Sequence, residues 1–151
     1  MILEEIKRIV KDMDIEFVFG NLYETNWSLD EVSRNTQADW FFVYITPFEV
    51  DDSIQVNAIH STFPLQFFVV NKVNNPTLAY TSELVQPIVD VARDKARNFI
   101  HRLNQSSLID KQTPGITEVK IRSEYAWQDL HLFGVSAECT VPVFEGKTGC
   151  V

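Results

Sequence analysis

A short run of the sequence, WFFVYI at residues 40–45, constrains the fold more than any other feature of the chain. In an extended strand, Trp40, Phe42 and Tyr44 lie on one face, and the three apolar residues between and after them lie on the other. A strand that is apolar on both faces needs an apolar cover on both faces. The run therefore predicts a strand in the interior of a sheet.

A second two-sided apolar run predicts the partner of this strand. Residues 65–73, LQFFVVNKV, alternate apolar side chains on both faces, so we expect the two runs to pair in the middle of the sheet. The stretch between them, residues 49–63, is too long for a tight hairpin turn. Its Ile54 and Val56 alternate with polar residues, which predicts a long hairpin that extends away from the core.

The remaining elements complete an α+β arrangement. Amphipathic spacing predicts helices over residues 1–13 and 83–104, with Pro87 either beginning or kinking the second helix. Period-two alternation predicts three further strands, at residues 15–21, 116–125 and 130–144, and Pro142 places the last strand at an edge or ends its pairing.

This order predicts one domain over residues 1–151 with a flexible tail at about 145–151. Its expected fold is a mostly antiparallel sheet of four to five strands, with two main helices packed on it and a long β-hairpin extension. The segment around Trp27 has no sustained period and is assigned to no element.

Charge and cysteine usage exclude several classes of protein. Thirteen Lys and Arg against 21 Asp and Glu give a net charge of -8, which disfavours a dedicated reader of DNA or RNA. Two cysteines without a C-x-x-C pair signal neither a disulfide framework nor a structural zinc site, which is typical of a reducing compartment. No stretch resembles a signal peptide or reaches the roughly 18 apolar residues of a membrane span, so we expect no membrane association.

The residues that could carry chemistry are scattered. His60, His101 and His131 fall in different predicted elements without a partner spacing typical of a triad or metal site. Cys139 falls on the apolar face of a strand, where a thiol behaves as a small hydrophobe. The five glycines are isolated, so no phosphate-binding loop is indicated. We therefore predict no catalytic, cofactor or metal site.

One enzymatic alternative remains open. Asp110, followed on a strand by Glu118 and Lys120, imitates the acidic residue and E-x-K arrangement of many Mg²⁺-dependent nucleases. Alternating Glu and Lys is also ordinary on an exposed strand face, where opposite charges pair across strands. A monomeric ligand-binding domain is the second alternative.

The succession of elements resembles a family of virion proteins. The MILEEIKRIV helix, the QADWFFVYITPF and LQFFVVNKV strands around a long loop, the SELVQPIVDVARDKARNFIHRL helix and the closing LHLFGVSAECTVPV strand resemble the tail terminator and head-to-tail joining proteins of tailed bacteriophages. The resemblance lies in element order and covers nearly the whole chain.

The resemblance implies a non-enzymatic subunit of a homo-oligomeric ring at the neck or tail of the virion. A hexamer is favoured, with a dodecamer as the alternative. The implied partners are other neck, portal or tail proteins, with DNA only passing through the lumen, and assembly takes place in the bacterial host cytoplasm. Surplus aromatic residues are typical of interface anchors. The predicted interface residues are Trp27, Trp40, Phe42, Tyr44, Ile54, Val56, Ile59, Phe63 and Trp127.

Overall fold

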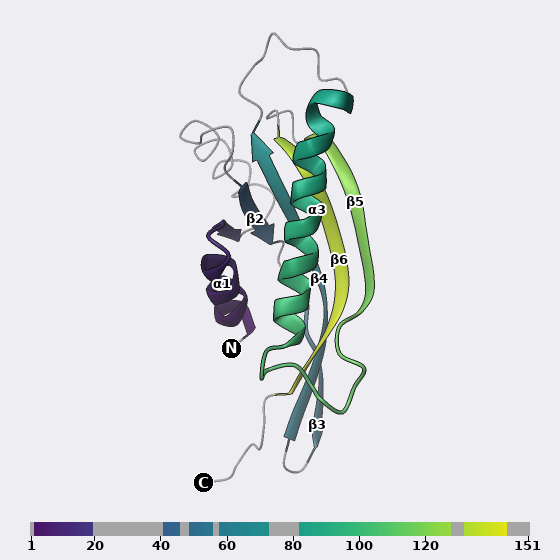
Figure 1. Cartoon of the computed structure of the whole chain (residues 1–151). Coiled ribbons are helices and arrows are strands. Elements are labelled where there is room, and N and C mark those ends of the chain that lie inside the picture. Colours follow the sequence, from purple (N-terminus) through teal and green to yellow (C-terminus); the bar gives the residue numbers. More distant parts are fainter. Residues whose placement is uncertain are drawn as a thin grey trace.

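A computed structural model describes residues 2–19, 41–45, 49–55, 58–72, 82–127 and 132–144. Two helices and six strands make up this part of the chain (Figure 1). In chain order they are α1 (Ile2–Asp12), β1 (Glu16–Phe19), β2 (Phe41–Ile45), β3 (Asp51–Gln55), β4 (Ala58–Lys72), α3 (Ser82–Asn104), β5 (Thr117–Trp127) and β6 (Leu132–Phe144).

The strands form one sheet in the order β1-β2-β4-β6-β5, and β3 pairs with the first residues of β4. The pairs β2–β4, β4–β6 and β5–β6 are antiparallel, which confirms the predicted α+β fold with its mostly antiparallel sheet and hairpin extension. The two apolar runs pair as predicted, with Val43 opposite Val69. The short β1 adds parallel to β2. Strand β6 is an interior strand, so Pro142 does not mark an edge; it lies near the end of β6, opposite Thr62.

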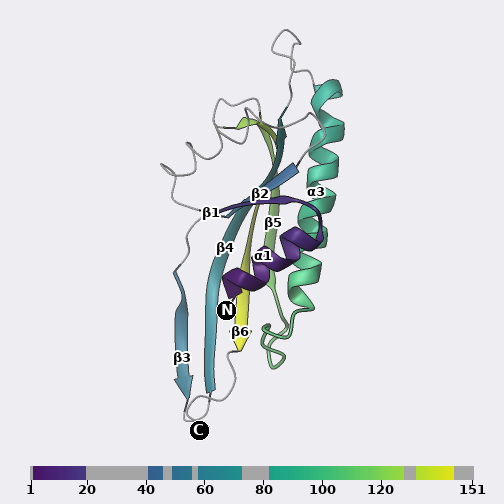
Figure 2. The ribbon, with the colours of Figure 1, turned by 90° about the vertical axis from the view of Figure 1, so that its left-hand side faces the viewer.

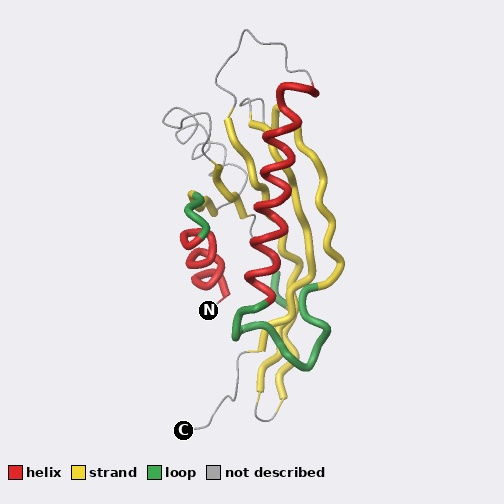
Figure 3. Tube along the Cα trace, in the orientation of Figure 1, coloured by secondary structure: helices red, strands yellow, loops and turns green. Residues whose placement is uncertain are grey.

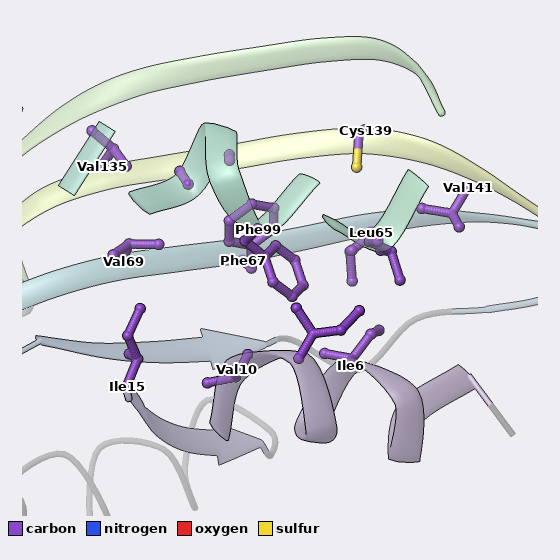
Figure 4. Close-up of a cluster of buried hydrophobic side chains, with 14 of the residues drawn as sticks. Ile6, Val10, Ile15, Leu65, Phe67, Val69, Phe99, Val135, Cys139 and Val141 are labelled. Atoms are coloured by element: carbon purple, nitrogen blue, oxygen red, sulfur yellow. The ribbon is translucent and has the colours of Figure 1, made fainter. Parts of the chain in front are cut away.

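The core lies between the helices and one face of the sheet (Figures 2 and 4). Alternate residues of β4, among them Leu65, Phe67 and Val69, are fully buried there, and they lie opposite buried residues of β6. The ring of Phe67 meets the ring of Phe99 from α3 edge to face, with centroids 4.9 Å apart. This pair joins the long helix to the centre of the sheet.

Helix α1 packs against the same core as α3. Its apolar stripe, Ile6, Ile9 and Val10, is buried, as the helical spacing predicted. On its polar side, Glu5 accepts a hydrogen bond from Arg8 Nη2 at 2.6 Å and another from Ser106 Oγ, after α3, at 3.0 Å. Glu5 therefore ties α1 to the chain that follows α3.

The structure decides between two alternatives for one expected element and departs from the expected pattern in another. Helix α3 begins at Ser82, so Pro87 lies inside the helix and does not begin it. In β5, Glu118 has a positive φ of 57°, and the register with β6 shifts between Thr117 and Lys120. Val119 lies in this β-bulge and is 45% exposed on the side of β5 that faces α3.

Candidate interaction surfaces

The β3–β4 hairpin, residues 51–62, projects beyond the helices (Figures 1 and 3). Its cross-strand pairs run from Asp51 opposite Thr62 to Gln55 opposite Ala58. Strand β6 accompanies β4 only from His60 onward, where Phe144 is its partner. The outer part of the hairpin therefore extends past the rest of the sheet.

The strand β3 side of this hairpin combines exposed apolar and acidic side chains. Ile54 is 75% exposed and Val50, just before β3, is 44% exposed. Asp51 and Asp52 lie between them, and Asp52 accepts a 2.6 Å hydrogen bond from the hydroxyl of Ser61. Strand β3 pairs with β4 on one side, so the backbone N–H and C=O groups along its other edge can pair with another chain, and the exposed Ile54 adds apolar area beside them.

A hydrogen bond between His60 and Asp110 joins the base of the hairpin to the loop after α3, and we name this pair the His60–Asp110 clamp. His60 Nδ1 lies 2.7 Å from Asp110 Oδ2, a distance at which the ring N–H donates to the carboxylate. The imidazole also packs against Phe144, with ring centroids 5.0 Å apart. The backbone N–H of Asp110 donates to the carbonyl oxygen of Pro142, so the loop takes the place of β5 beside the end of β6.

The pKa of Asp110 is lowered, which favours its ionised carboxylate as the acceptor in this clamp. The hydrogen bond from the backbone N–H of Gln112, and then the bond from His60, lower the pKa of Asp110, although desolvation opposes them. Sequence reasoning missed the pair, because 50 residues separate its members and the only pattern that singled out Asp110 was the nuclease-like arrangement, which does not include His60. Only the pairing of β3, β4 and β6 brings them together.

The sheet face opposite the helices is mostly polar. The register places Gln66 opposite Glu138, and Lys120 of β5 on the other side of Glu138. Lys120 Nζ and Arg122 Nη2 lie 3.9 and 4.0 Å from Glu138 Oε1. Because these side chains are exposed, the ion pairs contribute little to the stability of the fold. Phe68 is half-buried and Val70 is fully buried on this face, so apolar side chains are covered on both faces of the sheet only near β2.

The three residues of the nuclease alternative have three different partners. Asp110 binds His60, Glu118 accepts a 3.1 Å hydrogen bond from Thr140 Oγ1, and Lys120 faces Glu138. Among the described residues, no group of three or more His, Cys, Asp and Glu side chains could hold a metal ion. Cys139 is buried in the core, and burial raises the pKa of its thiol to about 12.

The predicted interface residues fall into three groups. Ile54 is exposed and Ile59 is half-buried, both in the hairpin. Phe63 is 1% exposed and packs in the core of its own subunit, because it lies on the helix-covered face of β4 opposite Val141. That position removes Phe63 from the candidate surface.

Three of the other predicted interface residues lie in described strands. Phe42 and Tyr44 lie in β2, opposite Val70 and Phe68, and Trp127 is the last residue of β5. The structure describes their backbone positions. The remaining residues lie outside the described residues, as do the segment around Trp27 and the predicted tail; they are Trp27, Trp40 and Val56.

Two depressions flank α3. One, of about 370 Å³, lies between α1 and the end of α3 and is mostly polar, with Arg8, Asp12 and Arg102 in its lining. The other, of about 250 Å³, runs between α3 and β5, and we name it the α3–β5 groove. Its lining is Arg97, Ile100, His101, Asn104, Ile116, Val119 and Ile121.

The chain matches no protein-family model and shows no significant sequence similarity to a curated protein. Among the described residues, neither helix has the length and apolar character needed to cross a membrane.

Proposed function

We propose that this chain is a non-enzymatic structural subunit of a phage virion that assembles into a homo-oligomeric ring at the neck or tail. The observation that carries the proposal is the hairpin, whose Ile54 is 75% exposed beyond the helical layer. An edge strand with that exposure favours pairing with another chain. The element order, which resembles that of tail terminators and head-to-tail joining proteins, supports the same assignment.

The charge of the chain is compatible with a channel wall. A net charge of -8 repels phosphate, so DNA would pass through the lumen without being gripped. The partners in this proposal are further copies of the chain, in a hexamer or alternatively a dodecamer, and the neck, portal or tail proteins above and below. The site of action is the virion, after assembly in the host cytoplasm.

The test is the mass of the purified protein in solution over a wide concentration range, combined with electron microscopy. The expected result is a closed ring of one discrete size. A strict monomer at high concentration, alone and with neck or tail proteins added, contradicts the proposal. Mg²⁺-dependent DNA cleavage that disappears in Glu118→Ala and Lys120→Ala also contradicts it and assigns the chain to the nucleases.

A further inference from the structure

The α3–β5 groove is an apolar depression between the long helix and a strand at the edge of the sheet. Ile100, Ile116 and Ile121 are each only partly buried there, and Val119 beside them is 45% exposed. Strand β5 pairs with β6 on one side and forms the end of the sheet order. An apolar depression beside a sheet edge is a surface suited to an apolar side chain from another element.

The exposed apolar residues gather in few places. Among the described residues, four large hydrophobic side chains are exposed: Val50, Ile54, Val91 and Val119. Two of them flank the acidic residues of the hairpin, and one lies in the groove. A protruding apolar element and an apolar depression thus exist on the same molecule.

The charges of the two surfaces are complementary. Among the described residues that line the groove, the ionisable ones are Arg97 and His101, and Arg97 also lies 3.9 Å from Asp94 of α3 in an ion pair whose two side chains are exposed. Residues 49–54 of the hairpin strand, EVDDSI, contain three carboxylates and no basic residue. Opposite charges around an apolar contact steer association and fix its register.

The hairpin cannot reach the groove of its own subunit. Strand β3 lies on the β2 side of β4, whereas the groove lies beyond β6, next to β5 at the opposite edge. Strands β4 and β6 separate the two surfaces over a long antiparallel register. The occupant that fits is therefore a second copy of the chain.

We propose that the hairpin of one subunit docks in the α3–β5 groove of the next. Ile54 enters between the isoleucines of the groove and Val119, while Asp51 and its acidic neighbours face Arg97. Donor and acceptor are different surfaces, so the contact is heterologous and repeats head to tail, which closes into a ring when the rotation between neighbours permits. This inference rests on the proposed ring and names the contact that builds it.

Cross-linking tests the contact directly. In a Cys150→Ser background, the double variant Ile54→Cys, Val119→Cys should form a ladder of disulfide-linked multimers under mild oxidation. The matched control is Ile54→Cys, Val91→Cys, because Val91 on α3 has the same 45% exposure as Val119 but lies outside the groove. The control should stay monomeric on a denaturing gel. A ladder in the control, or none in the test variant, overturns the inference.

A mixing experiment tests the head-to-tail geometry. Ile54→Asp disables the hairpin and Val119→Asp disables the groove, and each should weaken self-association by roughly 30-fold or more, as truncation of an interface hot spot does. An equimolar mixture of the two retains one intact hairpin and one intact groove, so it should form dimers and nothing larger. Val91→Asp should assemble like the unmodified protein, and circular dichroism should show all three variants folded.

The outcomes separate this inference from the proposed function. If the unmodified protein is a monomer at every concentration, the ring itself is refuted. If it forms rings that survive Ile54→Asp and Val119→Asp unchanged, the ring stands and the hairpin-to-groove contact is refuted.

Discussion

The one-sided core predicts very different effects for two neighbouring phenylalanines of β4. Phe67 is fully buried beneath α3, while Phe68 lies half-buried on the opposite face. Phe67→Ala should lower the free energy of unfolding by about 3 to 5 kcal/mol, because it leaves a cavity and removes the edge-to-face contact with Phe99. Phe68→Ala removes a side chain that stays partly in water and should cost about 1 to 2 kcal/mol.

Denaturant unfolding followed by far-ultraviolet circular dichroism measures both losses. A domain of this size has a total stability of roughly 5 to 15 kcal/mol, so both variants should remain folded, with Phe67→Ala melting roughly 10 to 15 °C lower. The measurements belong at a protein concentration where the chain is monomeric, since association adds to apparent stability. Equal losses for the two variants under that condition would refute the assignment of the core to one face of the sheet.

Three further predictions concern single positions. Gly134→Ala places a Cβ against the carbonyl oxygen of Val69, a main-chain atom that no side-chain rotation can relieve, and should lower the free energy of unfolding by about 1 to 3 kcal/mol or more; an unchanged denaturation midpoint contradicts this. The lowered pKa of Asp110 means that its carboxylate stabilises the fold above about pH 4, the ordinary value for Asp, and that this stabilisation is lost as the pH falls through the lower folded-state pKa. Asp110→Asn should therefore make the free energy of unfolding fall less steeply as the pH is lowered below about 4. An unchanged dependence on pH argues against the clamp. Because burial raises its thiol pKa to about 12, Cys139 should resist alkylation at pH 8 until denaturant is added, as mass spectrometry of a variant lacking the other cysteine can show; labelling of the native chain contradicts the burial.

The regular parts of the fold were predictable because their periodicity is strong. Helix α1 buries the residues that its spacing indicated, and β4 and β6 alternate toward the helices as expected. The two apolar runs pair with each other, as their shared apolar character on both faces predicted for neighbouring interior strands. Hydrophobic burial dominates these elements, so pattern alone was sufficient to identify them.

The candidate surfaces were less predictable because they depend on tertiary placement. The resemblance to the phage proteins assigned Phe63 to the hairpin surface, yet the register carries it onto the core face of β4. The register shift in β5 between Thr117 and Lys120 was not predictable, because a positive φ at a glutamate has no sequence signature. The pairing of His60 with Asp110 likewise required three strands and a loop to be in place first.

Strand β4 has a mechanical consequence for any neighbour that holds the hairpin. Its 15 residues span about 50 Å at roughly 3.3 Å per residue, and they run unbroken from the hairpin through the middle of the core. A force applied to the hairpin would therefore act along one continuous strand to Phe67, whose ring contacts Phe99 of α3. Strand β4 pairs with β6 without interruption from His60 to Lys72, so a force on the hairpin would load this strand pairing directly.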